Sequence, residues 1–423
     1  MARPRGALAL VLLGLLAGCA DSPADRARDH QGRPNVVVLM TDDQTVESMR
    51  VMPGLRRTLA ARGTTFSRSF VSFPLCCPSR ATFLTGQYAH NHGVVGNRPP
   101  TGGYGALDAA ETLPVWLRRA GYLTMHVGKF LNRYGIDGPP TEVPPGWEEW
   151  HASVDPLTYE YYGARLNENG TLRTYPETYS TDLYARRAEE LIARAGARGR
   201  PFLLSVGFLA PHAGGPRESD DPAGLATPAP ARRHRDRFDA EPLPHAVRVA
   251  GREADLSDKP RFVRERPPIG PAQARAVEEN YRQRLESLLA VDEAVVSIVD
   301  ALRDSGELAD TLVIFTSDNG FFHGEHRMAS EKMLAYEPSV RVPLIMRGPG
   351  VPAGGERRQL VTNADLAPTI LDVAGAAATK PQDGISLMPL LADPHRSWDR
   401  DLLIEGPEGF TVEAYRALRT SRY

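Results

Sequence analysis

Runs of apolar residues of strand length recur along this chain between more polar segments. Residues 35–41 are continuously apolar and rich in β-branched side chains, which is typical of a strand buried on both faces of a parallel sheet. Further strands of this kind are predicted over residues 122–127, 202–209, 311–317 and 342–346. A short extended run is expected over 64–71 and another strand over 412–419.

Helices are predicted between the strands. They are expected over residues 52–62, 78–85, 111–120, 182–194 and 271–305. The last is about 35 residues long, carries an apolar stripe from Val277 to Leu302, and ends before Gly306. Because buried strands alternate with helices, we predict an α/β fold in which helices cover both faces of one sheet.

Residues 213–270 differ from the rest of the chain, because they are dense in Pro, Arg and Asp and show little periodicity. Long segments of this kind in a compact domain usually carry function. We therefore expect this region to border the active site and to influence substrate choice.

The composition is that of an ordinary globular protein, with 42% hydrophobic and 24% charged residues in a chain of 423. The net charge of −2 predicts no general attraction to nucleic acid or to acidic membranes. The three cysteines are Cys19, Cys76 and Cys77. If Cys19 is lipidated and Cys76 is modified, as considered below, Cys77 is the one thiol left. No internal disulfide can then form, and the fold depends on its hydrophobic core alone.

The N-terminus has the pattern of a targeting segment. Two arginines precede an apolar run over 7–17 that is too short to span a bilayer comfortably. The run ends in Leu16-Ala17-Gly18-Cys19, which resembles a bacterial lipobox and implies cleavage before Cys19 and lipidation of its sulfur. We predict a signal peptide over 1–18, a tether over 19–34, and a protein anchored at the outer face of a bacterial cell membrane. A plain secretory signal, giving a secreted protein, is the alternative.

Two adjacent cysteines and a proline stand at the start of the predicted helix over 78–85. Cys76 is expected at the helix N-terminus, where free N–H groups and the helix dipole favour an anion. Arg80, one turn further on, adds a planar and permanently charged group for a tetrahedral oxyanion. This spacing indicates chemistry on a sulfate or phosphate group. The alternative is a pair of small buried cysteines with no chemical role.

Two of the predicted strands end in pairs of oxygen-bearing side chains, Asp42-Asp43 and Asp318-Asn319. Functional sites gather beyond the carboxyl ends of strands in open α/β sheets, so we expect these four side chains to converge. Three carboxylates and an amide oxygen are hard ligands that suit Ca²⁺ or Mg²⁺ rather than zinc. Asp and Asn also end strands in ordinary turns, which is the alternative for each pair taken alone.

The run from Cys76 to Arg80, followed by Leu84-Thr85-Gly86, resembles the motif of the type I sulfatases, which belong to the alkaline-phosphatase-like superfamily. The resemblance implies that Cys76, not Cys77, is oxidised to Cα-formylglycine by a formylglycine-generating enzyme. The hydrated aldehyde would be the nucleophile that forms a covalent sulfate–enzyme intermediate. The implied fold is a large, mixed, mostly parallel sheet between layers of helices, with a smaller C-terminal antiparallel domain that is largely missing.

The same resemblance implies a divalent cation, Ca²⁺ with Mg²⁺ as the alternative. Its implied ligands are Asp42, Asp43, Asp318, Asn319 and Cys76 in its formylglycine form.

Further roles follow from motifs at other positions. Lys129 matches the family's Gly-Lys lysine, His212 its Pro-His histidine, and Lys332 its late lysine. Arg80 and the lysines are expected to neutralise the sulfate oxygens in the transition state. Asp318 is expected to take a proton from residue 76, and His212 or Lys332 to protonate the leaving alcohol.

One position departs from the common pattern. Many sulfatases have a histidine two residues after the Gly-Lys lysine, where this chain has Leu131. The pattern Gly-Lys-x-Leu-Asn, with Asn132 as a candidate substrate contact, instead resembles N-acetylglucosamine-6-sulfatases and extracellular heparan sulfate endosulfatases. The doubled cysteine, residues 88–92 and residues 144–147 resemble the same branch. Within 88–92, the alternative for His90 and His92 is that they are packed or capping histidines near the cleft.

We predict a catalytic domain over 35–392 and the start of a truncated C-terminal subdomain over 393–423, whose first strand is expected at 415–419. The predicted function is hydrolysis of sulfate esters on a sulfated carbohydrate, such as 6-sulfated N-acetylglucosamine. One alternative is a phosphonate monoester or phosphodiester hydrolase of the same fold. Another is a non-catalytic lipoprotein that binds sulfated glycans.

Overall fold

The computed structural model describes residue 1 and residues 32–251, 253, 255–407 and 414–422. The predicted signal peptide, Cys19 and almost all of the predicted tether lie outside the described residues. Among the helices within these ranges, none is both long enough and apolar enough to span a membrane.

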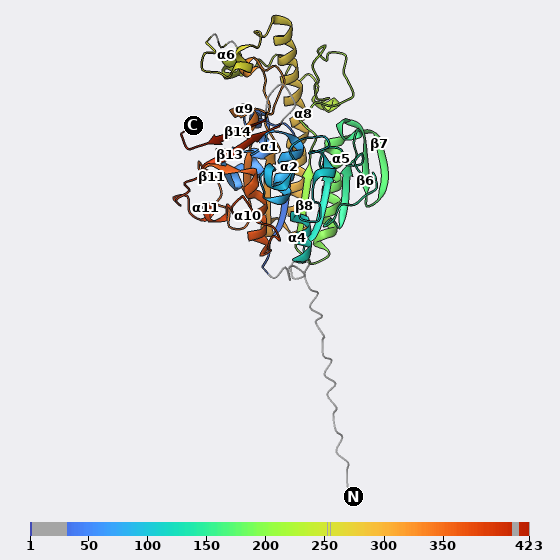
Figure 1. Ribbon diagram of the computed structural model, residues 1–423. Helices are drawn as coiled ribbons and strands as arrows, with labels where there is room; N and C mark the ends of the chain where they lie inside the picture. The colour runs from blue at the N-terminus through green and yellow to red at the C-terminus, as the bar shows by residue number, and fades with distance from the viewer. Residues whose placement is uncertain (2–31, 252, 254, 408–413, 423) are drawn as a thin grey trace.

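A ten-stranded sheet runs through the molecule (Figure 1), in the order β11-β2-β10-β9-β1-β8-β4-β5-β6-β7. The five strands from β9 to β5 are parallel, whereas β10, β6 and β7 pair antiparallel. The strands are β1 (Asn35–Thr41), β2 (Thr64–Phe66), β4 (Leu123–Gly128), β5 (Glu149–Ser153), β6 (Tyr162–Glu168), β7 (Thr171–Tyr179), β8 (Phe202–Gly207), β9 (Thr311–Ser317), β10 (Leu344–Arg347) and β11 (Gly355–Arg357). The predicted mixed, mostly parallel sheet is confirmed.

Helices cover both faces of this sheet, as predicted. The helices are α1 (Pro53–Thr58), α2 (Cys76–Thr85), α3 (Ala89–His92), α4 (Leu113–Arg119), α5 (Ser180–Gly196), α6 (His245–Gly251), α7 (Arg261–Arg264), α8 (Pro271–Asp304), α9 (Glu337–Val340), α10 (Leu366–Ala374) and α11 (Met388–Ala392). One apolar core lies between the sheet and α1, α5 and α8, and the other lies between the sheet and α2, α4, α10 and α11.

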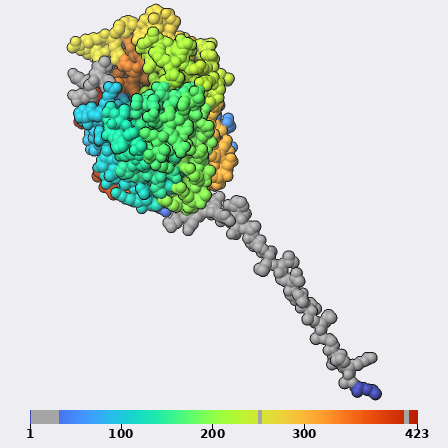
Figure 2. Space-filling model, turned by 90° about the vertical axis from the view of Figure 1, so that its right-hand side faces the viewer, coloured from blue at the N-terminus to red at the C-terminus, as the bar shows by residue number. Residues whose placement is uncertain are grey.

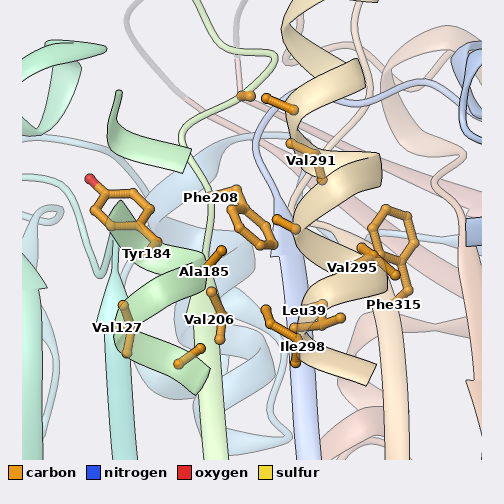
Figure 3. Close-up of a cluster of buried hydrophobic side chains, with 14 of the residues drawn as sticks. Leu39, Val127, Tyr184, Ala185, Val206, Phe208, Val291, Val295, Ile298 and Phe315 are labelled. Atoms are coloured by element: carbon orange, nitrogen blue, oxygen red, sulfur yellow. The ribbon is translucent and has the colours of Figure 1, made fainter. Parts of the chain in front are cut away.

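β1 shows how one continuous apolar run serves two cores. Val37 and Leu39 join the core beneath α5 and α8, whereas Val36, Val38 and Met40 join the core on the opposite face. Successive side chains of a strand point to opposite faces, so a strand covered on both sides must be apolar throughout. Figure 3 shows the first of these cores, with Leu39 packed beneath the α8 side chains.

Some elements differ from the sequence prediction. The outer strands β5, β6 and β7 were not predicted, because β7 is largely exposed and none of the three is a continuous apolar run. The extended run over 64–71 is divided between β2 and a two-residue strand, β3 (Ser69–Phe70), which pairs parallel with β12 (Val361–Thr362) in a separate small sheet.

The C-terminal part forms a two-stranded antiparallel sheet of β13 (Leu402–Gly406) and β14 (Tyr415–Arg419). The strand predicted over 412–419 is therefore present from Tyr415. It is the second strand of this sheet and not the first, because Leu402 and Ile404 alternate into a small core and make the preceding strand.

The region over 213–270 is mostly irregular and contains the short helices α6 and α7. In Figure 1 it lies above the end of the sheet at which β1 and β9 finish, beside the free N-terminal part of α8. Figure 2 shows the same region above the surface that β6, β7 and α5 form. The prediction that this segment borders the edge of the sheet carrying the candidate residues agrees with this placement.

Glu286, in the buried part of α8, gives a prediction for stability against pH. It accepts a hydrogen bond from the Phe238 N–H at 3.1 Å. Burial, reinforced by the charges of Glu279, Asp236 and Asp239, raises the pKa of its carboxyl to about 7. The folded protein therefore holds this proton more tightly than the unfolded chain, so stability is lost as the pH rises from about 4.3 towards 7.

We expect Glu286→Gln, which keeps the shape and cannot ionise, to raise Tm at pH 8 and to change it little at pH 4. Thermal unfolding at the two pH values measures the difference. An equal shift at both values would show that ionisation of Glu286 is not the cause.

Candidate active site

The predicted ligand pairs lie together at one end of the sheet. β1 and β9 are parallel neighbours paired along their whole length, so the residues that follow them emerge side by side. The Asp43 N–H donates to Asp318 Oδ1 at 3.2 Å, and Asn319 Nδ2 lies 2.6 Å from Asp43 Oδ1. These three side chains and Asp42 are all buried.

Cys76 is the first residue of α2, as predicted, and the helix ends before Gly86. Its Sγ lies 3.5 Å from Asp42 Oδ1 and 2.9 Å from Lys332 Nζ. Burial and the charge of Asp42 raise the pKa of the Cys76 thiol, against the opposing effect of the neighbouring lysines. An unmodified Cys76 is therefore protonated at neutral pH and is a poor nucleophile.

Arg80 joins the two strand ends from its position one turn along α2. Its Nε donates to Asp318 Oδ2 at 2.7 Å and its Nη2 to Asp42 Oδ2 at 3.0 Å. Its Nη1 donates to the Lys129 carbonyl at 2.8 Å. A guanidinium buried between two carboxylates is held in one orientation, because each N–H direction has its own acceptor.

Lys129 reaches the same carboxylate from the end of β4. Its Nζ lies 2.5 Å from Asp42 Oδ2, and its side chain is 1% exposed. The turn that places it uses Gly128, which has a φ of +88° and whose missing Cβ would lie 2.2 Å from the Gly207 carbonyl. Only glycine permits this close approach between β4 and β8.

Two further cations surround Asp43. Lys332 Nζ lies 2.5 Å from Asp43 Oδ1 as well as close to Cys76. Arg284, from the buried stripe of α8, donates through Nη2 to the Asp43 carbonyl at 2.5 Å and lies over the Phe321 ring. Asp43 itself has a φ of +65°, a conformation that these partners and its neighbours hold in place.

His212 faces the carboxylates from the loop after β8. Its Nδ1 lies 2.6 Å from the Ala213 carbonyl, which can only accept a hydrogen bond, so Nδ1 carries the proton. Its Nε2 then faces Asp43 Oδ2 at 3.7 Å and Asp42 Oδ1 at 4.0 Å. Burial lowers the pKa of His212 to about 4, although both carboxylates oppose this effect.

These donors fit a divalent cation. Donor atoms of Asp42, Asp43, Cys76 and His212 all lie within 4.8 Å of one another. An unprotonated imidazole nitrogen facing two carboxylates is repulsive unless positive charge lies between them. Asn319 Oδ1 is also buried without a hydrogen-bond partner. Oxygen on residue 76 in place of sulfur would make the set harder and better suited to Ca²⁺.

The candidate substrate contact Asn132 reaches the site through a residue that the sequence prediction missed. Asn132 Nδ2 donates to the Tyr159 hydroxyl at 2.6 Å, and the Tyr159 ring lies 4.7 Å from Lys129 Nζ and 5.3 Å from the His212 ring. Tyr159 lies in a loop with no recognisable motif. Arg284 was missed as well, and its position among the apolar residues of α8 was the one available sign.

The two histidines of residues 88–92 have structural partners. His92 Nε2 lies 3.1 Å from Thr82 Oγ1 of α2, and His90 Nδ1 lies 3.0 Å from Glu405 Oε1 of β13. His92 is thus packed against α2, whereas His90 is exposed and pairs with Glu405 at the surface. Leu131, at the position where many sulfatases have histidine, is buried in the core beneath α2 and α4.

Curated proteins are similar to this chain over most of its length. It is 38% identical over 389 residues to an arylsulfatase of Volvox carteri, covering 87% of this chain and 59% of that protein. It is 34% identical over 412 residues to the N-acetylglucosamine-6-sulfatase of Homo sapiens, covering 93% and 71% respectively. An extracellular sulfatase homologue of Drosophila melanogaster is 33% identical, and 34% of its length is covered. The chain thus spans less than two thirds of the first and third relatives.

Solved structures share the fold. A protein in complex with its substrate D-glucosamine-2-N,6-O-disulfate superposes with a TM-score of 0.74 and 25% identity, covering 92% of this chain and 87% of that one. A phosphonate monoester hydrolase from Silicibacter pomeroyi superposes with a TM-score of 0.63 at 22% identity, covering 92% and 89%, which shows the fold alone. The sulfatase family model matches residues 34–376, and the chain therefore belongs to the sulfatase family.

Proposed function

We propose that this protein hydrolyses sulfate esters on a sulfated sugar, such as a 6-sulfated N-acetylglucosamine unit. The observation that carries the proposal is the set of cations around Cys76, where Lys332 Nζ lies 2.9 Å from its Sγ and Arg80 and Lys129 share the adjacent Asp42. The N-acetylglucosamine-6-sulfatase relative and the solved glucosamine disulfate complex support the choice of sugar.

In this proposal a formylglycine-generating enzyme oxidises Cys76 to formylglycine. The match of residues 34–376 to the sulfatase family model supports the modification. Asp318 takes a proton from the hydrated aldehyde, whose oxygen then attacks the sulfate. Burial and the charge of Asp42 raise the pKa of Asp318 to about 6 despite Arg80, which suits a group that takes up a proton near neutral pH.

The other residues bind and orient the sulfate. Arg80, Lys129 and Lys332 supply fixed positive charge to its oxygens in a site from which water is largely excluded. A Ca²⁺ ion held by Asp42 and its neighbours would supply further charge to polarise the sulfate. Lys332, which is charged and lies beside residue 76, or His212 once it has taken up a proton at Nε2, protonates the leaving alcohol.

Export is part of the proposal. The extracellular relative supports a location outside the cytoplasm, and lipidation at Cys19 would anchor the catalytic domain over 35–392 to the membrane. Asn35 begins β1, whereas the site residue Asp42 follows the opposite end of the same strand.

Matched substrates test the proposal. The purified, formylglycine-containing protein should hydrolyse 4-nitrophenyl sulfate faster than 4-nitrophenyl phosphate, and should release sulfate from N-acetylglucosamine 6-sulfate. Faster cleavage of phosphate or phosphonate esters would favour the alternative hydrolase. Binding of sulfated glycans without turnover, together with an unmodified Cys76 thiol, would favour a non-catalytic binding protein.

A further inference from the structure

The segment that carries Lys332 is held from two directions at the next residue, Met333. The Met333 N–H donates to the Pro74 carbonyl at 3.0 Å, two residues before Cys76. The Met333 carbonyl accepts a hydrogen bond from the Tyr415 hydroxyl at 2.7 Å. Met333 has a φ of +79°, in the left-handed region that side chains other than glycine rarely adopt. Such a conformation persists only where the surroundings impose it.

Tyr415 belongs to β14, far from Lys332 in sequence, and its ring lies across β13. It pairs with Gly406, where an added Cβ would lie 1.9 Å from a Tyr415 ring carbon. Any side chain at this position would therefore displace the ring. The ring packs against two small apolar clusters, and its open side lines a cavity of about 350 Å³ with Phe262, Leu334 and Tyr336.

The β13–β14 sheet is itself fixed to the segment that leads into α2. The Glu405 N–H donates to the Ser72 carbonyl at 2.8 Å, and Glu405 also receives His90 of α3. The sheet that carries the Tyr415 hydroxyl is therefore bound to the same segment that leads into Cys76. This arrangement keeps Lys332 and Cys76 in register although 256 positions separate them.

We propose that Tyr415 is a positioning residue for Lys332. By holding the Met333 carbonyl, it maintains the backbone conformation that keeps Lys332 Nζ between residue 76 and Asp43. The Lys332 ammonium group contacts Cys76 and Asp43 at the same time, which requires its backbone to lie within reach of both. The effect on catalysis rests on the proposed function, whereas the position of Lys332 does not. Gly406 serves the same purpose by leaving room for the ring.

The first test is Tyr415→Phe, which keeps the ring in its pocket and removes only the hydroxyl. We expect kcat for a sulfate ester to fall about tenfold with little change in KM, as for the loss of one hydrogen bond that matters in the transition state. The matched control is Tyr122→Phe, which removes a hydroxyl bonded to the Pro34 carbonyl at 2.8 Å at the far end of the sheet. The control should keep the wild-type kcat with a similar change in Tm.

A crystal structure of the same variant gives a readout that does not depend on activity. Lys332 Nζ should move away from residue 76 and Asp43 in Tyr415→Phe and stay in place in Tyr122→Phe. Gly406→Ala should cause the same displacement with the hydroxyl intact. If Lys332 and Met333 keep their conformation in both site variants, or if Tyr415→Phe keeps the wild-type kcat, the proposal is wrong. An inactive wild-type protein with a displaced Lys332 in the variants would instead overturn only the proposed function.

Discussion

Replacing Cys76 with alanine is expected to lower kcat for sulfate ester hydrolysis by about 10⁵-fold, because loss of a covalent nucleophile lowers kcat by this order of magnitude. Cys76 is the first residue of α2, with Asp42 and Lys332 in contact with its sulfur. Alanine keeps the helix and leaves no group to carry the modification. The charged side chains and the other metal ligands remain, so binding of the substrate should be affected far less than kcat.

Cys77→Ala is the matched control for this variant. Cys77 carries the same side chain one position later, but it is packed in the core beneath α2 and α4. Removal of its buried sulfur is expected to lower Tm slightly and to keep kcat.

Mass spectrometry of the tryptic peptide 69–80 from the wild-type protein should show an aldehyde in place of the Cys76 thiol. Fragmentation of the peptide distinguishes Cys76 from Cys77. Full activity in a protein whose Cys76 thiol is intact would refute the proposed nucleophile. Equal losses in the two alanine variants would mean that the effect comes from packing.

Asp42→Asn is expected to lower kcat by at least about 10³-fold and to remove the proposed divalent cation from the protein. The Asp42 carboxylate lies within contact of Arg80, Lys129 and the Cys76 sulfur, and it is fully buried. Burial would raise its pKa, but Lys129, His212 and Arg80 hold the pKa of this carboxyl well below its usual value. It is therefore ionised at every working pH, and asparagine removes a full charge.

The change should also destabilise the fold, because Lys129 is buried and would lose its anionic partner. Asp292→Asn separates the two effects. Asp292 is another buried aspartate, and it accepts hydrogen bonds from the Gly54 and Leu55 N–H groups at the start of α1. This control should lose stability and keep both kcat and metal.

Metal content measured by elemental analysis, thermal unfolding and steady-state kinetics on both variants provide the comparison. Asp42→Asn that retains one equivalent of calcium would show that Asp42 is not a ligand. A loss of metal in Asp292→Asn would show that metal binding depends only on overall stability.

The central strands and the two ligand pairs that follow them were predictable from the sequence because their causes are local, whereas Lys129, His212 and Lys332 rested on the resemblance to the sulfatases. A strand covered on both faces must be apolar at every position. The continuous runs over 35–41 and 311–317 therefore indicate buried strands. Polar groups directly after such strands must lie at the carboxyl edge of the sheet. Asp42 and Asp318 were therefore found as a pair before any contact between their loops was known.

Other features were not predictable because their causes are contacts between distant segments. The sequence does not indicate that Tyr159 would lie over Lys129, or which group the arginine in the buried stripe of α8 would bind. The outer strands β6 and β7 lie at the edge of the sheet with many exposed side chains, and pairing rather than burial makes them strands.

The sequence by itself therefore determined the α/β class, the residues with the chemistry of a sulfatase, and the edge of the sheet at which they meet. Only the tertiary structure decided how these residues contact one another, including the placement of Lys332 beside Cys76 through Met333 and Tyr415. The physical reason is that burial and helix termini restrict which residue types occur at nearby positions, so they can be recognised in the sequence. Side-chain contacts across 256 positions depend instead on how whole elements pack.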